Sequence, residues 1–490
     1  MKKFIPFTLL AFLLFTLNAV AQTITAKVTD AQQQPIEYAN IQIGATYSVV
    51  SNTEGVFVVN PKDLTDTDKV TISCIGFETI QIPLSDLKSG TYVLKEQVTV
   101  LGEVFISNKQ LSPTEILTEV IKNAPKNYSQ KASKQTFFLR SSSENKMIDN
   151  KIELIKASLD NKATLKDINK EFEALSKKTK NKTSKDFFEA YGSLYKQDKL
   201  SKLSIEKAIQ LKNKEKDVSG EEVNNKLIEV IKKYLEPDAT YKVRSGIIPI
   251  SDSLKFDTPE KEIKNDAKTS HLRNQITSLS NSLNKFYNNE DLDFLTEFKR
   301  YIYTLEGYAT INDETIYIID FKPAKSSADF YGKIYVNAFD FAVVKLDYNL
   351  VDGKTAHNIN LKFLLGVKMK EDNNRVIATF SKNDGGLYAL NFVKEQKRVY
   401  GYMNRSMKFT KNKVDKKEET KMIKADILAE YETNTTKELF FVDSKTINNE
   451  DFGKVVEKEK YNINYISKYD PAIWKDYNIL APVEAIKNYN

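Results

Sequence analysis

Short apolar segments that alternate with polar residues dominate this chain of 490 residues, and they favour folds built around β-sheets. The alternation is clear over residues 24–28 and 39–43, and apolar and aromatic segments of strand length return from Tyr301 onward. Polar turn sequences such as Asp384-Gly385-Gly386 separate the later segments. Capped helical segments lie between the two regions, so the sequence predicts a mostly β chain with added helices, of the α+β class.

The later segments predict an antiparallel β-meander of about eight strands with helices on one side. Its predicted strands are Tyr301–Leu305, Thr315–Phe321, Gly332–Val336, Ala342–Leu350, Asn358–Met369, Arg375–Phe380, Leu387–Val393, Arg405–Phe409 and, later, Ala425–Tyr431. Predicted turns include Asp372-Asn373-Asn374.

The first hundred residues predict a small β-sandwich. Six or seven short strands are separated by turns at intervals of 8–12 residues, a spacing that is typical of sandwiches. The turn Asn52–Gly55 supplies a glycine where a tight hairpin needs a positive φ.

These residues resemble the carboxypeptidase regulatory-like domain, a transthyretin-like sandwich found in envelope proteins of Bacteroidetes. The resemblance covers about Thr23 to Leu94 and is carried by these motifs: Val28-x-Asp30, Pro35-Ile36-x-x-Ala39-x-Ile41, Gly44-x-Thr46, Asn52-x-x-Gly55-x-Phe57 and Ile75-Gly76-Phe77. In that family the domain is an accessory and not a catalytic unit. The segment Leu101–Ile106 resembles a joint to an outer-membrane transporter plug, but it reads better as a last strand or linker, since fewer than 390 residues follow.

The N-terminus has the pattern of a cleavable export signal. Met1-Lys2-Lys3 is positively charged, Phe4–Leu17 is apolar, and Ala19-Val20-Ala21 is a small-x-small cleavage site. The apolar run is shorter than the roughly 20 residues that a membrane-spanning helix needs. Cys74 is the only cysteine, so it cannot form an internal disulfide, and none stands at the cleavage site to carry a lipid.

The segment between the sandwich and the meander predicts a helical region. Ser112–Glu115 is a capping box with proline at the first helical position, and Pro125 is expected to end that helix. Further caps are expected where an acidic residue follows Thr or Ser by three positions, at Thr164, Thr183 and Ser219. The apolar residues between these caps have helical spacing, which predicts amphipathic helices with solvated, lysine-rich faces.

A second resemblance concerns the C-terminal half. Ile318–Pro323, Phe330–Val336 and Ala342–Tyr348 are similar to an uncharacterised Bacteroidetes family that follows this sandwich, and Trp474–Asn478 is similar to its closing motif. The same strands are faintly similar to the half-barrel of lipoprotein carriers. That resemblance implies a curved sheet that holds acyl chains against helices.

No catalytic motif stands out. Zinc peptidases need a His-x-x-Glu pair, whereas Asn274 and Asn360 stand three residues after His271 and His357. No Gly-x-Ser-x-Gly elbow occurs, and carboxylate pairs of the glycosidase type remain open. Charges of both signs are interleaved for a net charge of +7, which does not favour a nucleic-acid partner.

Aromatic side chains of the meander are the only ligand surface that the sequence suggests. Most of them are expected in the core, and the remainder could line a concave apolar or sugar-stacking surface. The candidates are Tyr301, Tyr303, Tyr317, Tyr335, Tyr388 and Tyr400.

The predicted organisation is a signal peptide over 1–21, the regulatory-like sandwich over 22–96, a linker over 97–111, a helical region over 112–240, an antiparallel sheet domain over 241–450 and a tail over 451–490. The predicted protein is an exported, non-enzymatic envelope protein of the periplasm or outer membrane, without cofactor or metal. It would bind other envelope proteins or an apolar or glycan ligand. Two alternatives stay open: a periplasmic carrier of a lipid or another apolar ligand, and a hydrolase of glycans or peptides.

The cleavage site gives the first testable prediction. The mature protein should begin at Gln22, because Ala19 and Ala21 are the small residues that signal peptidase requires. Intact mass measurement on protein from the envelope fraction decides this. A species that retains Met1 in that fraction would contradict it.

Overall fold

The computed structural model describes residues 23–44, 47–61, 64–99, 111–128, 131–158, 162–212, 229, 236, 239–255, 266–288, 290–311, 314–383, 385–413, 415, 417 and 420–489. The predicted signal segment and the predicted cap at Ser219 lie outside these residues. The described part is mostly β with a few helices, as expected for an α+β chain. None of its helices is long and apolar enough to cross a bilayer.

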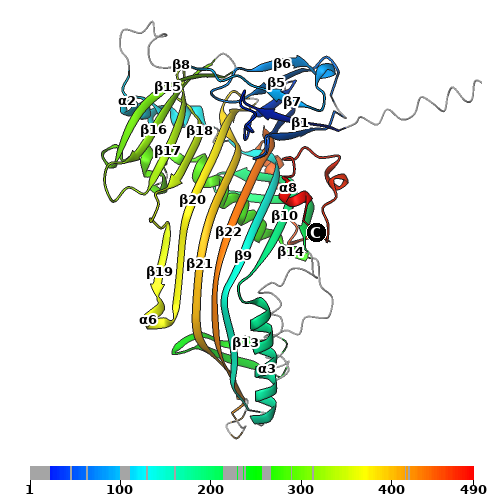
Figure 1. Cartoon of the computed structure of the whole chain (residues 1–490), viewed down its shortest axis with the longest axis vertical. Coiled ribbons are helices and arrows are strands. Elements are labelled where there is room, and N and C mark those ends of the chain that lie inside the picture. Colours follow the sequence, from blue (N-terminus) through cyan, green and yellow to red (C-terminus); the bar gives the residue numbers. More distant parts are fainter. Residues whose placement is uncertain are drawn as a thin grey trace, which may run out of the picture.

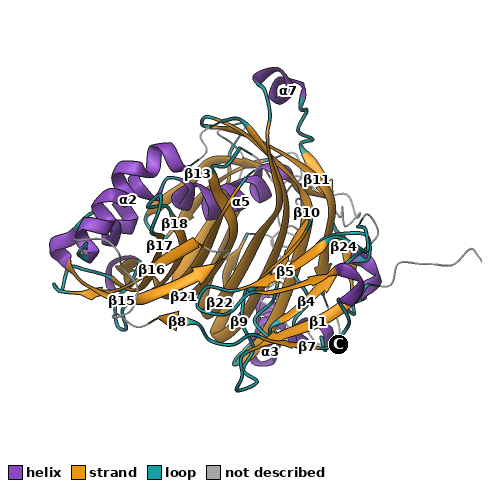
Figure 2. Ribbon diagram, turned by 90° about the horizontal axis from the view of Figure 1, so that it is seen from above, coloured by secondary structure: helices purple, strands orange, loops and turns teal. Residues whose placement is uncertain are grey.

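One large curved sheet organises the molecule (Figures 1 and 2). Its main path runs β24-β11-β10-β9-β22-β21-β20-β18-β17-β16-β15-β8, while β12, β13 and β19 join beside β20 and β21. In chain order its strands are β8 (Val98–Thr99), β9 (Ser133–Ala157), β10 (Lys182–Gln197), β11 (Leu200–Leu211), β12 (Thr240–Ser245), β13 (Ile248–Lys255), β15 (Tyr301–Ile311), β16 (Glu314–Pro323), β17 (Phe330–Asn337), β18 (Val343–Leu350), β19 (His357–Leu361), β20 (Val367–Lys382), β21 (Tyr388–Lys411), β22 (Met422–Thr446) and β24 (Asn464–Ile466).

Two small sheets form the N-terminal unit and share one apolar core. One has the order β4-β1-β7 and the other β3-β2-β5-β6. Their strands are β1 (Ile24–Thr29), β2 (Asn40–Ile43), β3 (Tyr47–Val50), β4 (Val56–Val59), β5 (Lys69–Ser73), β6 (Ile80–Pro83) and β7 (Thr91–Val93). Gly55 has φ +73°, and a Cβ atom at this position would lie 2.3 Å from Val28 O. The hairpin therefore needs glycine there.

The helices are few and short relative to the strands. They are α2 (Pro113–Asn127), α3 (Lys162–Thr179), α5 (Thr269–Asn284), α6 (Lys362–Leu365), α7 (Asn449–Lys454) and α8 (Glu484–Lys487), with 3-10 turns η1 (Leu84–Asp86), η2 (Phe286–Asn288), η3 (Glu290–Leu295), η4 (Phe298–Arg300) and η5 (Pro471–Trp474). The predicted capping box of α2 is present, since Ser112 and Glu115 cap one another. A small pair of β14 (Asp266–Lys268) and β23 (Lys460–Asn462) completes the elements.

The two faces of the large sheet are covered differently. In the view of Figure 1, the inner face of the upper half of the sheet packs against α2 and α5. Leu117, Ile276 and Leu139 lie there in one continuous core. The opposite, outer face packs against the N-terminal unit and the C-terminal tail, where Tyr38 and Trp474 share a core with Phe138, Phe392 and Phe440. The N-terminal unit therefore packs directly on the sheet.

The predicted helical region over 112–240 is corrected by the structure. Strands β9, β10 and β11 fill much of it, and the expected helix start at Thr183 lies inside β10. Only α2 and α3 are regular helices among its described residues. Strand pairing explains the error, because β9 pairs along its length with β22, almost 300 residues later in the chain. Such tertiary pairing overrides local helix propensity.

Three smaller expectations also change. The turn predicted at Asp372–Asn374 is a bulge inside β20, where Asn373 takes φ +53° and the strand continues to Lys382. The predicted linker contributes Val98–Thr99 to the large sheet as β8, and residues 100–110 lie outside the described part. The predicted sheet boundary at 241 is absent, because β12 and β9 belong to one sheet.

A buried charge cluster joins the sheet to the C-terminal tail. Arg140 is 1% exposed and pairs with Glu189 at 2.7 Å. Its other nitrogens donate to the carbonyls of Leu480 and Ala481, both at 2.9 Å. Trp474 Nε1 donates to the second oxygen of Glu189 at 2.6 Å. The tail is therefore held by hydrogen bonds that saturate an otherwise costly buried ion pair.

Helix α3 protects an open edge of the sheet. Beyond its pairing with β10, the lower half of β9 has β22 on one side only. Leu154 N donates to Asn169 Oδ1 at 2.7 Å, and Asn169 Nδ2 donates back to Leu154 O at 3.0 Å. Ile168 and Phe172 of α3 pack beside Ile152. The helix therefore occupies the strand edge that could otherwise pair with another chain.

The charge cluster gives the second prediction. Arg140→Met should lower the free energy of unfolding by about 3–5 kcal/mol, because it leaves Glu189 buried without its ion-pair partner. Urea denaturation followed by circular dichroism measures this loss.

Two further variants test the cause. Arg140→Met combined with Glu189→Gln should recover part of the loss, since glutamine still accepts from Trp474 and carries no charge. Lys151→Met breaks the exposed pair with Glu153 and should leave the free energy of unfolding nearly unchanged. Equal losses for Arg140→Met and Lys151→Met would contradict the argument.

Candidate functional site

The six candidate tyrosines do not share one surface. Tyr301 is buried and donates to Asp293 at 2.6 Å, while the neighbouring Tyr303 donates to Phe294 O at 2.8 Å. Tyr317 is buried beside Tyr308.

The other three tyrosines lie apart from these. Tyr335 is half-buried beneath the Lys345 ammonium, and Tyr388 is buried with its hydroxyl on Asp340 at 3.0 Å. Tyr400 donates to Glu430 at 2.6 Å across the outer face of β21 and β22. Most of these rings are core or network residues, and only Tyr388 lines a described cavity.

A different surface, on the inner face of the sheet, has the character of a ligand site. Alternate residues of a strand share a face, so positions at even distances from the core residues Val393 and Leu439, including those eight and ten residues away along β21 and β22, stay on the inner face. In the lower half of the sheet this face carries two adjacent cross-strand rows. The first row is Leu361, Val367, Met403 and Ala429, and the second is Ile359, Met369, Gly401, Tyr431 and Met147. We call these two rows the apolar floor.

The apolar floor is partly open to solvent. Ile359 is 49% exposed, Tyr431 40% and Met369 37%, although these are large apolar or aromatic side chains. Gly401 leaves the space that the Tyr431 ring fills, because a Cβ there would lie 2.3 Å from the ring carbon Cζ. Exposed apolar side chains grouped on one face are uncommon in soluble proteins and often mark a binding surface.

A charged belt separates the apolar floor from the main core above it. Lys397 pairs with Glu395 at 3.0 Å and with Glu371 at 3.3 Å, across β20 and β21. Burial lowers the pKa of Lys437, and the Glu395 carboxylate beside it only partly offsets this. The belt rows also hold hydroxyl and amide side chains: Thr433 and Asn145 share a row with Glu371, and Thr435 and Ser143 share the next row with Lys397. Above the apolar floor, the inner face thus carries three rows in which hydroxyl-bearing and charged side chains are mixed.

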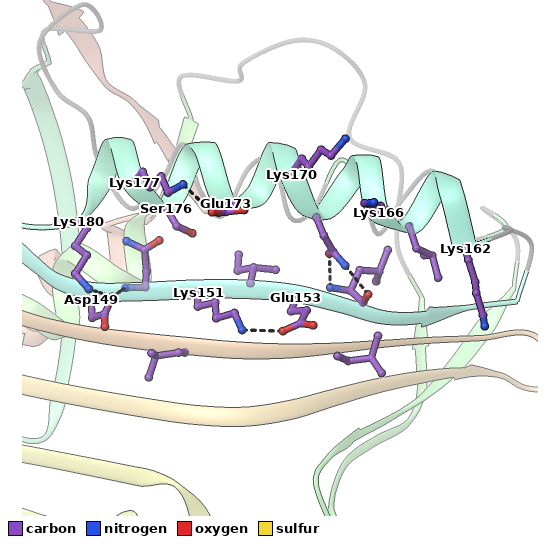
Figure 3. A pocket seen from close by; sticks show the side chains of 17 residues that line it. Asp149, Lys151, Glu153, Lys162, Lys166, Lys170, Glu173, Ser176, Lys177 and Lys180 are labelled. Atoms are coloured by element: carbon purple, nitrogen blue, oxygen red, sulfur yellow. Dashed lines mark hydrogen bonds and ion pairs between the residues drawn. The ribbon is translucent and has the colours of Figure 1, made fainter.

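A second surface is the groove between α3 and the lower half of β9 (Figure 3). Its volume is about 1090 Å³, and apolar side chains such as Leu165 and Leu428 line it with six lysines and three carboxylates. The lysines are Lys151, Lys162, Lys166, Lys170, Lys177 and Lys180.

The charges of this groove are largely paired and solvated. Three lysines pair with the three lining carboxylates at 2.7–2.9 Å. The side chains of these lysines are half or more exposed. Asn169, which caps the edge of β9, spans the groove. We therefore interpret it as the solvated side of an edge-protecting helix, and the apolar floor as the better ligand candidate.

The described residues show no arrangement of three or more His, Cys, Asp or Glu side chains that could hold a metal ion. His271 lies on α5 and His357 is exposed on β19, next to Glu371. Burial raises the pKa of the Cys74 thiol, despite the nearby Lys345 charge, so this thiol is a poor nucleophile.

Comparison with known proteins adds little. No protein-family model matches the chain, and no curated protein matches it by sequence. A solved structure of a LolA superfamily protein from Nitrosomonas europaea is similar at a TM-score of 0.19 and 9% identity, over 71% of this chain and 99% of that one. At that TM-score the similarity carries no argument about fold or function. The resemblance of the N-terminal unit to the regulatory-like domain stays a prediction.

The belt gives the third prediction. A lysine whose pKa is lowered by burial binds protons more weakly in the folded chain than in the unfolded chain, so it destabilises the fold at neutral pH. Lys437→Met keeps the length of the side chain and removes the charge, and should therefore raise the melting temperature at pH 7.

The gain should shrink as the pH rises through the lowered pKa of Lys437, because the neutral amine no longer opposes folding. Lys424→Met, on the outer face of the same strand, should leave the melting temperature nearly unchanged. A lower melting temperature for Lys437→Met would show that its charge stabilises the fold.

Proposed function

We propose that this protein is an exported, non-enzymatic binding protein of the cell envelope, and that its ligand is an amphiphile with an acidic headgroup. The export pattern of residues 1–21 supports the location. One observation carries the ligand class: the apolar floor lies open on the inner face of a curved sheet, one to three rows away from hydroxyl and lysine side chains.

The order of the rows supports an amphiphile over a purely apolar ligand. An alkyl chain on Met369, Met403 and Tyr431 would be removed from water at a gain of about 25 cal/mol per Å² of buried apolar surface. Lys437 lies three rows away, or about 20 Å from Tyr431 at roughly 3.4 Å per residue. This separation suits a chain of medium length with its anionic group at Lys437.

The charge at Lys437 supports the same ligand. No residue that the structure describes forms a hydrogen bond or ion pair with the Lys437 ammonium group. Burial lowers the pKa of this group. An anionic headgroup would satisfy this group and raise its pKa again. Keeping a lysine that opposes folding is understandable if the charge serves binding.

A second observation favours contact with an anionic membrane surface. Arg405 donates to Leu365 O at the end of α6 and to Ser245 at the end of β12. These hydrogen bonds link α6 to the turn between β12 and β13, and both carry exposed apolar side chains. Phe363 is 99% exposed and Ile247 86%. Residues 241–251, 361–370 and 399–411 around them hold eight lysines and arginines, of which Lys242, Lys370 and Lys411 pair with carboxylates outside these segments. Basic charge beside exposed apolar side chains suits the surface of an anionic bilayer.

The fourth prediction tests the ligand with a matched pair of variants. Met403 and Asn404 are neighbours on β21 whose side chains lie on opposite faces of the sheet. Met403→Glu should weaken binding of 11-(dansylamino)undecanoic acid at least tenfold, because a carboxylate would meet the alkyl chain on the apolar floor. Asn404→Glu adds the same charge on the outer face and should leave binding unchanged.

Fluorescence titration of the mature chain with this probe gives both dissociation constants. Lys437→Met should weaken binding of the acidic probe and leave that of its neutral methyl ester unchanged. Absence of saturable probe binding, or equal effects of Met403→Glu and Asn404→Glu, would exclude the apolar floor as the site.

A further inference from the structure

A separate cavity at the upper end of the inner face combines three features that no element of the fold explains. It has a volume of about 460 Å³ and lies between the end of α5, the start of β9 and the turn that joins β10 to β11. The main core separates it from the apolar floor. Its volume is in the range of pockets that hold small ligands.

The first feature is an excess of positive charge. Lys131, Lys196, Lys199 and Lys285 line the cavity with a single carboxylate, Asp198. Lys196 is the least exposed of these four side chains, and burial, followed by repulsion from Lys285, lowers its pKa to about 8. It donates one hydrogen bond, to Ser280 Oγ at 3.1 Å. An ammonium group has three donors, so Lys196 keeps capacity for a ligand.

The second feature is a buried acceptor. Gln135 lines the cavity and is only 4% exposed, yet its side-chain oxygen accepts no hydrogen bond from any residue that the structure describes. A buried amide oxygen without a donor destabilises the fold, because it loses its hydrogen bonds to water and gains none in return. A donor on a bound molecule, such as a hydroxyl group, would satisfy it.

The third feature is a pair of aromatic rings. Tyr128 and Tyr388 both line the cavity, and their ring centroids lie 5.9 Å apart. Both hydroxyls are already engaged, Tyr128 as donor to Val343 O at 2.7 Å and Tyr388 as donor to Asp340 at 3.0 Å. Both rings are only 4% exposed and belong to the main core, so they give the cavity an apolar wall rather than polar groups.

We propose that this cavity is a binding site for a small acidic sugar, that is, a sugar that carries a phosphate or carboxylate group. Lys196 and Lys285 bind the anionic group, Gln135 Oε1 accepts from a sugar hydroxyl, and Tyr128 and Tyr388 form the apolar wall of the site. The site is independent of the apolar floor, so either can fail without the other.

The fifth prediction uses glucose 6-phosphate, inorganic phosphate and glucose as probes of the full mature chain, with isothermal titration calorimetry. Glucose 6-phosphate should bind at least tenfold more tightly than inorganic phosphate, and glucose should bind more weakly than both. Lys196→Met should weaken binding of both anions at least tenfold. Gln135→Leu should weaken binding of glucose 6-phosphate and leave the affinity for inorganic phosphate unchanged.

Controls separate the site from general attraction to a basic surface. Lys162→Met in the groove beside α3 removes a lysine outside the cavity and should change none of the three affinities. Lys285→Met, at an exposed position, should weaken anion binding if Lys196→Met does not fold. Equal binding of phosphate and glucose 6-phosphate, or equal losses for Lys162→Met and Lys285→Met, would overturn the proposal.

Discussion

The buried ion pair of Arg140 and Glu189 is the contact on which the arrangement of the three parts depends. Burial works against the arginine charge, and the Glu189 and Glu438 carboxylates outweigh it, so the pKa of Arg140 stays above its usual value. The tail carbonyls that accept from Arg140 belong to the same segment that accepts from Asn52 of the N-terminal unit. One saturated cluster thus fixes the tail, the sheet and the N-terminal unit against one another.

Sequence patterns predicted the local elements well and the large sheet poorly. The capping box of α2, the glycine turn at Gly55 and most strands of the meander follow from short-range rules. The strands β9 and β10 do not, because their lysine- and serine-rich lower halves lack a clear alternation of apolar residues. Pairing with β22 and with each other determines their structure, and one sequence contains no signal for partners so far apart.

The candidate sites were predictable only in part. The aromatic pattern of its strand makes Tyr388 a ligand candidate, and Tyr388 does line the upper cavity. The residues of that cavity outside this strand come from four separate segments of the chain. Gln135 and Lys196 are unremarkable in the sequence, and only their burial without full pairing distinguishes them. The apolar floor could not be predicted from the sequence, because its residues come from five strands, β19, β20, β21, β22 and β9. Each strand contributes at most one residue to a row.

The length of the central strands gives the sheet two different halves. In the upper half, α2 and α5 fill the inner face, and burial there is complete enough to stabilise the fold without a ligand. In the lower half, α3 closes the edge of β9 and leaves Met369 and Tyr431 exposed on the inner face. The stability of the upper half permits this exposure, because a chain that already has a large core can leave apolar surface open for a partner. The same argument applies to Lys437 and Gln135, whose incomplete pairing opposes folding and is compatible with a stable chain only because the rest is well packed.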